Sequence, residues 1–165
     1  MTNIRHLGEI HIQSAKTKAL QLFAFSGAIF PGEWIDSYVQ EVTRVLLEFA
    51  FHARRVNQLC GIDVKKLSSI KIMPVTISKN DPSDWIEKYS DALNYLIHAK
   101  EFTFGNCHTD HRILFTNTKS NLIPLYVRVT TDQKPVGTIS LFGLSHCFLS
   151  EIIPLSRDKF PNWDF

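Results

Sequence analysis

Residues 41–59, EVTRVLLEFAFHARRVNQL, decide the fold of this chain. At about 100° per residue, five polar side chains fall within a sector of roughly 80° on one helix. They are Glu41, Arg44, Glu48, His52 and Arg55. Valine, leucine and phenylalanine cover most of the remaining surface. A helix that is apolar on most sides is expected in the middle of a helical bundle.

The polar stripe has three interpretations, which the sequence leaves open. Glu48 lies four residues from both Arg44 and His52, so the stripe can be an ion-pair ladder within the helix. Alternatively it faces a cleft, and Arg44, Glu48, His52 and Arg55 are then candidates for binding an anionic ligand. A self-complementary contact between two copies of the chain is the third interpretation.

Length and composition fit one compact domain. A chain of 165 residues can bury a substantial core without disulfides or a metal. Its hydrophobic content of 44% excludes a disordered chain. The net charge of +2 is too small to indicate nucleic acid by itself, and it does not exclude RNA.

Targeting signals and cysteines indicate a cytoplasmic protein. The first residues carry charges where a signal peptide needs an apolar core. The longest apolar run, residues 19–30, is too short to cross a membrane, so no membrane association is expected. Three widely spaced cysteines, Cys60, Cys107 and Cys147, indicate reduced thiols. No phosphate-binding glycine loop or other cofactor motif is present, so no cofactor is expected.

Hydrophobic periodicity predicts three helices in the first two thirds of the chain. The first covers about residues 12–25, and the second runs from about residue 33 to residue 59 or 60, where Gly61 ends it. Residues 63–79 are mixed, and Pro74 restricts them to an edge strand or an extended connection. The third helix is expected over about residues 82–102.

The last third of the chain is predicted to contain strands. Residues 106–121 are polar enough to be a loop. Two alternating segments around Asp132 then predict a β-hairpin over about residues 122–141. A short helix over about residues 140–153 should follow and be stopped by Pro154. The predicted fold class is therefore mainly α, a single domain with a bundle of four to five helices and a C-terminal β-hairpin.

Two segments of the chain resemble the central helices of HEPN-type helical bundles. They are LLEFAFHARRVNQLCG and, after a spacer, LNYLIHAKEF, within about residues 34–104. The resemblance implies a compact bundle that forms a homodimer. Many members of the family are metal-independent ribonucleases of toxin–antitoxin, phage-defence or RNA-processing systems. Their active members use an arginine, four to six residues, and then a histidine.

The catalytic motif of that family is not intact in this chain. His98 aligns with the histidine and Asn94 with the polar residue that often follows the arginine, but Leu93 occupies the arginine position. A guanidinium would hold the scissile phosphate while the histidine handles a proton, and leucine can do neither. Catalysis by His98 would need a cation from elsewhere, such as Lys100 or Arg54; otherwise His98 is a solvated surface residue.

A second cluster of reactive side chains has the sequence CHTDH. Cys107, His108 and His111 are possible metal ligands, but zinc sites usually combine two separated ligand pairs, and only one such pair is present. A histidine-rich surface loop is the preferred interpretation, so no metal is expected. Cysteine–histidine nucleophilic chemistry would need an orienting partner that the sequence does not identify.

The resulting hypothesis is a HEPN-like cytoplasmic protein that does not catalyse a reaction. It would bind RNA or a protein partner in a defence, toxin–antitoxin or other RNA-associated role. One alternative is a divergent metal-independent ribonuclease or an enzyme acting on a small anionic ligand. The other is a structural or assembly protein.

Overall fold

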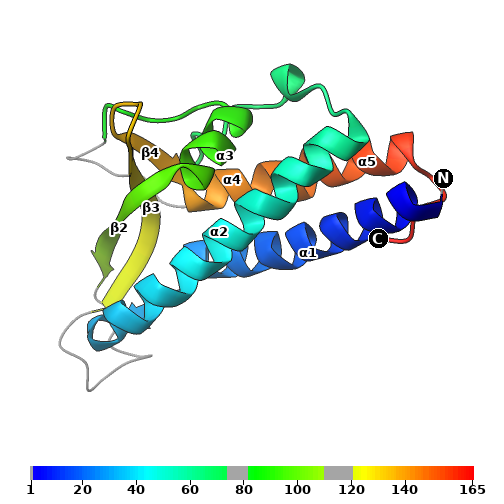
Figure 1. Cartoon of the computed structure of the whole chain (residues 1–165). Coiled ribbons are helices and arrows are strands. Elements are labelled where there is room, and N and C mark those ends of the chain that lie inside the picture. Colours follow the sequence, from blue (N-terminus) through cyan, green and yellow to red (C-terminus); the bar gives the residue numbers. More distant parts are fainter. Residues whose placement is uncertain (1, 74–81, 110–120) are drawn as a thin grey trace.

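The structure of the chain is a computed structural model that describes residues 2–73, 82–109 and 121–165. Two long helices, α1 (Thr2–Gly27) and α2 (Ile35–Cys60), form an antiparallel pair. In Figure 1 this pair occupies one side of the molecule, with the sheet at one end and both termini at the other.

Helix α2 confirms the helix predicted from about residue 33 to residue 59 or 60, but Leu47 and Phe51 are exposed on its surface, so its predicted position in the middle of a bundle is wrong. It ends at Cys60 because Gly61 adopts the left-handed conformation, with φ of 56°, and the cap N–H donates to the Asn57 carbonyl. Glycine takes this conformation without steric cost. Helix α1 extends well beyond the predicted residues 12–25 at its N-terminal end.

The sheet contains four strands within the described residues: β1 (Phe30–Pro31), β2 (Ala99–Thr109), β3 (Asn121–Thr131) and β4 (Gly137–Ser140). All three strand pairs are antiparallel. Strand β2 pairs with β3 along its whole length, so β1 and β4 share the other edge of β3. The predicted β3–β4 hairpin is confirmed. The wider sheet corrects the predicted fold class, because the chain is a mixed α and β protein and not purely a bundle.

The third predicted helix, residues 82–102, is much shorter than expected. Helix α3 covers only Tyr89–Ile97. Before it, Thr138 N–H donates to the Asp84 carbonyl and Ile86 N–H donates to the Thr138 carbonyl, both at 2.8 Å, so these residues are extended beside β4. After it, the alternation of exposed Glu101 and Thr103 with partly buried Phe102 fits a strand better than a helix.

The predicted loop over residues 106–121 is corrected at both ends. Residues 106–109 complete β2, and Asn121 begins β3. The remainder of that loop, residues 110–120, lies outside the described residues. Residues 67–73 of the predicted extended segment contain no helix or strand, and residues 74–79 of that segment also lie outside the described part.

The C-terminal helical region continues through the proline that was expected to stop it. Helix α4 (Leu141–Cys147) is followed by a π-helical turn, η3 (Phe148–Ile152), and by α5 (Ile153–Lys159). Pro154 lies in the first turn of α5, where a missing backbone N–H is tolerated. The prediction of a stop at Pro154 is therefore wrong.

One contiguous hydrophobic core joins the helices to the inner face of the sheet. Helix α1 packs against α2, α4 and β3. A close approach occurs at Gly143 in α4, where an added Cβ would lie 1.8 Å from the Ile70 carbonyl oxygen. Glycine at this position lets the segment after α2 cross α4.

Candidate functional site

The first half of the polar stripe on α2 is an ion-pair ladder. The Arg44 guanidinium donates to Glu41 at 2.5 Å and to Glu48 at 2.6 Å. Lys18 of α1 contacts the second oxygen of Glu48 at 2.5 Å. Hydrogen bonds from Arg44 and Lys18 hold the pKa values of Glu41 and Glu48, respectively, below their usual range. Arg44 is about half exposed, with a relative accessibility of 49%, so the ladder lies on the surface between the two helices.

The middle of the stripe contains a histidine pair that the sequence did not reveal. His52 Nδ1 lies 2.9 Å from Nδ1 of His11 on α1, so one ring donates its proton and the other accepts it. Burial lowers the pKa of both imidazoles. The Arg55 charge lowers that of His11 further, and the His11 charge does the same to His52. The pair therefore favours the neutral state.

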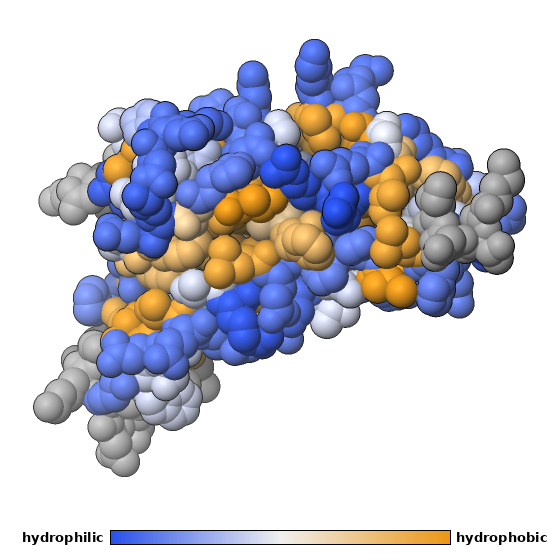
Figure 2. Space-filling model, viewed as in Figure 1, coloured by the Kyte–Doolittle hydropathy of each residue, from blue (hydrophilic) through white to orange (hydrophobic). Residues whose placement is uncertain are grey.

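The end of the stripe differs from its beginning. Arg55 donates to the Gln58 side chain at 3.2 Å, and no described carboxylate contacts Arg55 or its neighbour Arg54. Both arginines line a hollow of about 310 Å³, together with Phe51, Gln58 and Ile97 of α3. Figure 2 shows one face of the molecule, on which apolar side chains gather between strongly polar regions.

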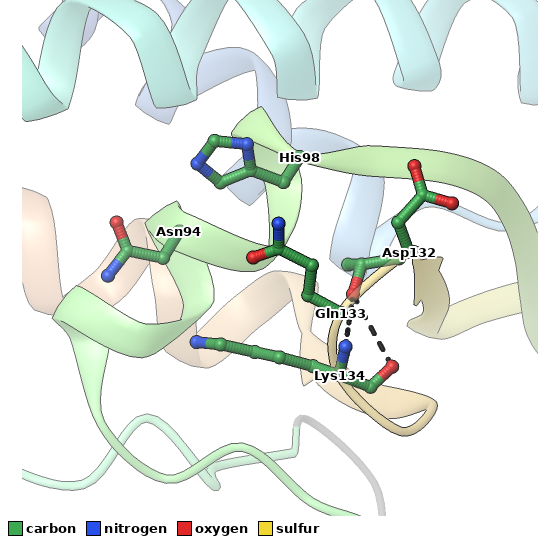
Figure 3. Close-up of a pocket in the computed structure, with 6 residues that line it drawn as sticks. Asn94, His98, Asp132, Gln133 and Lys134 are labelled. Carbon is green, nitrogen blue, oxygen red and sulfur yellow. Dashed lines mark hydrogen bonds between the residues drawn. The ribbon is translucent and has the colours of Figure 1, made fainter.

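A second, smaller hollow contains the two residues aligned with the HEPN motif. Its volume is about 120 Å³, and Asn94 and His98 line it on one side. The β3–β4 turn forms the other side with Thr131, Asp132, Gln133 and Lys134. Figure 3 shows the Gln133 amide lying between His98 and Asn94, the Asn94 side chain directed away from these two, and the Lys134 chain running beneath Asn94.

The turn that forms this hollow is held by its own hydrogen bonds. Lys134 N–H donates to the Thr131 hydroxyl at 3.0 Å. The Lys134 ammonium lies 5.0 Å from the centre of the Tyr95 ring, a cation–π contact that leaves its charge without a described carboxylate partner. Asp132 is neutralised by an ion pair with Lys100. The hollow thus offers imidazole, amide and ammonium groups to an anion.

Both hollows border the end of α3, because one is lined by Ile97 and the other by His98. The structure therefore brings Asn94 and His98 together in one hollow. It places Arg55 in the other hollow, whereas Arg44 and Glu48 of the ladder line neither hollow. Sequence reasoning did not identify Gln133 or Lys134. The Asp132-Gln133-Lys134 turn was predicted, but its position beside α3 follows from the pairing of β2 with β3.

The arrangement around His98 provides hydrogen-bond donors but no complete proton-transfer system. No hydrogen bond joins the His98 side chain to a carboxylate or a second histidine in the described part of the chain. General acid–base catalysis usually depends on such an oriented partner. The site has the chemistry of anion binding.

The candidate metal ligands are not assembled into a described site. Cys107 and His108 are neighbours on β2, and successive side chains of a strand point to opposite faces of the sheet. His111 lies outside the described residues. Within residues 2–73, 82–109 and 121–165, no group of three or more histidine, cysteine, aspartate or glutamate side chains could hold a metal ion.

Comparison with known proteins adds no relative: no protein-family model, curated protein or solved structure matches this chain. The resemblance to HEPN bundles therefore stays a prediction. In the described residues, no helix is both long and apolar enough to span a bilayer.

Proposed function

We propose that this protein is a HEPN-like RNA-binding protein that does not cleave RNA, and that RNA binds across the two hollows at the end of α3. The observation that carries the proposal is the set of cations lining these hollows. Arg54, Arg55 and Lys134 make no described ion pair, whereas Arg44, Lys18 and Lys100 each have a carboxylate partner.

Phosphodiesters suit such a surface. Each nucleotide carries one negative charge, and an arginine fork can donate two hydrogen bonds to one phosphate. Arg54 and Arg55 would hold phosphates in one hollow, and Lys134 with His98 and Asn94 would hold them in the other. Since the net charge of the chain is only +2, binding would depend on local groups of cations, and Arg54 and Arg55 are adjacent cations that line one hollow.

Two observations favour binding over cleavage. Leu93 occupies the position of the arginine in the HEPN motif, and it is buried with 2% exposure, so it contributes no charge to the hollow. His98 also lacks a described orienting partner. A protein of this kind would act in an RNA-associated, defence or toxin–antitoxin setting by sequestering RNA, and we expect it to be cytoplasmic and to form a homodimer.

The direct test measures anisotropy of a labelled single-stranded RNA of about 12 nucleotides over a salt series. In the Arg54→Gln/Arg55→Gln variant, affinity should fall about tenfold or more, and the slope of log affinity against log salt should fall by about 1.4 for two lost phosphate contacts. Arg44→Gln is the matched control, because this arginine lies on the same helix and is already paired. Equal losses in both variants would contradict the proposal.

The ribonuclease alternative is tested with the same RNA. Incubation of wild type and His98→Ala with the labelled strand should leave both samples uncut. Cleavage by wild type that is lost in His98→Ala would establish the enzyme and overturn the non-catalytic role.

A second candidate is association through an apolar surface. Leu47 and Phe51 lie one turn apart on α2, with exposures of 43% and 53%. Exposed apolar neighbours of this kind are typical of protein interfaces. Light scattering of wild type and Leu47→Ala would identify such an interface if only the variant were monomeric.

A further inference from the structure

We infer that the hollow lined by Phe51, Arg54, Arg55, Gln58 and Ile97 holds one unstacked nucleotide of a single strand, with its base against Phe51 and its phosphate on the arginines. This inference deepens the proposed function and rests on it. It adds a ligand class, single-stranded RNA rather than duplex, and a residue that recognises it.

Phe51 is unusual among the aromatic residues of α2 because it is exposed. Its relative accessibility is 53%, whereas Phe49, two residues earlier, has none. The ring makes edge-type contacts with His11 and His52, at interplanar angles of 61° and 80°, and no described ring lies parallel to it. Phe51 therefore has a ring surface on which a planar group can stack.

Part of the lining of the hollow comes from a different helix. Ile97, the last residue of α3, lines it together with Phe51 of α2. The hollow thus offers an aromatic ring and an aliphatic side chain, from separate helices, as apolar surface for a flat base. At about 310 Å³, the hollow lies at the lower end of the range of pockets that accept small organic ligands.

The polar side chains of the hollow match the other parts of a nucleotide. Arg54 and Arg55 are free of described carboxylates and can bind phosphate. Gln58 uses its carbonyl oxygen to accept a hydrogen bond from Arg55, so its amide N–H groups remain available to an acceptor on a base or ribose. A basic groove with an aromatic platform is the usual arrangement in proteins that bind single strands.

A nucleotide fits this surface better than a second copy of the chain. Across a twofold axis, the hollow would bring two pairs of arginines together. Glu48, one turn before His52, is engaged by Arg44 and Lys18 and cannot neutralise them. The bases of an A-form duplex are stacked within the helix and unavailable to Phe51, so a single strand is the expected ligand.

The experiment compares a single-stranded RNA with the duplex of the same sequence, using wild type, Phe51→Leu and Trp34→Leu. Trp34→Leu is the control, since it also removes an exposed aromatic ring but Trp34 does not line the hollow. Phe51→Leu should weaken single-strand binding about tenfold, as expected for one lost base stack. Duplex binding should not change in either variant.

A strand containing 2-aminopurine gives an independent readout, because the fluorescence of this base reports its stacking. Binding to wild type should change the emission, and binding to Phe51→Leu should not produce that change. Thermal unfolding of both variants checks that the fold is retained.

The outcomes separate the two proposals. Absence of any salt-dependent RNA binding would overturn both the proposed function and this inference. Binding that is equal for single strand and duplex, and unaffected by Phe51→Leu, would overturn only the nucleotide pocket. Conversion of a wild-type dimer to a monomer by Phe51→Leu, without loss of RNA binding, would show that Phe51 contacts a second copy and would also overturn the pocket.

Discussion

Both halves of α2 carry arginines, but only the half before His52 also carries carboxylates. Before His52, Arg44 lies between Glu41 and Glu48, and Lys18 completes the ladder from α1. After His52, Arg54 and Arg55 have no described carboxylate partner and line a hollow. Charged side chains before His52 therefore link α2 to α1, whereas the arginines after His52 are available to a ligand.

The histidine pair marks the boundary between these halves. His52 receives the charge effects of Glu48 and Lys18 from the ladder, whereas His11 receives that of Arg55 from the hollow. A change of protonation at the pair would therefore be felt in both directions along the seam between α1 and α2.

The largest expected effect on stability is the loss caused by replacing Phe49, compared with replacing Phe51 on the opposite side of α2. Phe49 is fully buried and contacts the Phe148 ring edge-on, with centroids 5.3 Å apart. Phe49→Ala should reduce the free energy of unfolding by about 3–5 kcal/mol. Phe51→Ala should reduce it by only about 1 kcal/mol, because its side chain is half exposed and loses only part of a buried surface. Urea unfolding of the two variants provides the measurement, and similar losses would show that Phe51 belongs to the core.

Acidification should have the next largest effect. Burial lowers the pKa of His11 and His52 below the ordinary value of 6.5, so the unfolded chain binds more protons than the folded chain as the pH falls below that value. Stability should therefore be fully present above about pH 6.5 and decline below it. Melting temperatures measured from about pH 7.5 to about pH 5.5 test this. Each kcal/mol of lost stability should lower the melting temperature by about 2–4 °C.

The control for the pH series is the His11→Gln/His52→Gln variant. Its melting temperature should decline less steeply over the same interval, because the two titrating groups are gone. An equally steep decline would assign the acid sensitivity to other groups.

Breaking the ladder should cost less. Arg44→Ala removes contacts to both Glu41 and Glu48, but all three side chains are partly exposed to solvent. Exposed ion pairs contribute about 0–1 kcal/mol. We therefore expect a loss below about 1 kcal/mol in urea unfolding at low salt, and a smaller loss at high salt. A loss of several kcal/mol would mean that the ladder is a principal support of the fold.

The smallest effect is expected near the start of α2. The hydroxyl of Tyr38 is buried without a described hydrogen-bond partner, and its ring is held by stacking on Phe30 at 4.5 Å. Tyr38→Phe keeps the ring and removes the unsatisfied hydroxyl, so stability should stay the same or rise by up to about 1 kcal/mol. A clear loss in thermal unfolding would indicate that the hydroxyl binds a water or another group.

The sequence predicted α2 and the β3–β4 hairpin well because each has a local signal. Periodic apolar residues and Gly61 define the helix, and alternation around Asp132 defines the hairpin. It did not predict the ends of α3, since the residues beside that helix are held by distant partners. Asp84 and Ile86 pair with Thr138, and Ala99 pairs with Thr131.

The candidate site shows the same division between local and distant information. Asn94 and His98 share a helix face, so their proximity was predictable. The contributions of Lys134 to their hollow and of His11 to the His52 pair were not, because both depend on how separate elements pack. The pairing of Arg44 with Glu41 and Glu48 follows from their spacing on α2, whereas the contact of Lys18 with Glu48 comes from α1 and could not be located from sequence spacing.

The sheet pairing and the contacts of α1 also bear on how the chain folds. Strand β1 follows α1 directly but pairs with β3, and α1 packs against both β3 and α4. During vectorial synthesis the α1–α2 pair emerges long before these partners, with its apolar inner face uncovered. The folding rate should therefore be limited by the formation of contacts between residues that are distant in the chain. We expect the protein to fold more slowly than a helical bundle with local contacts, although most of its residues are helical.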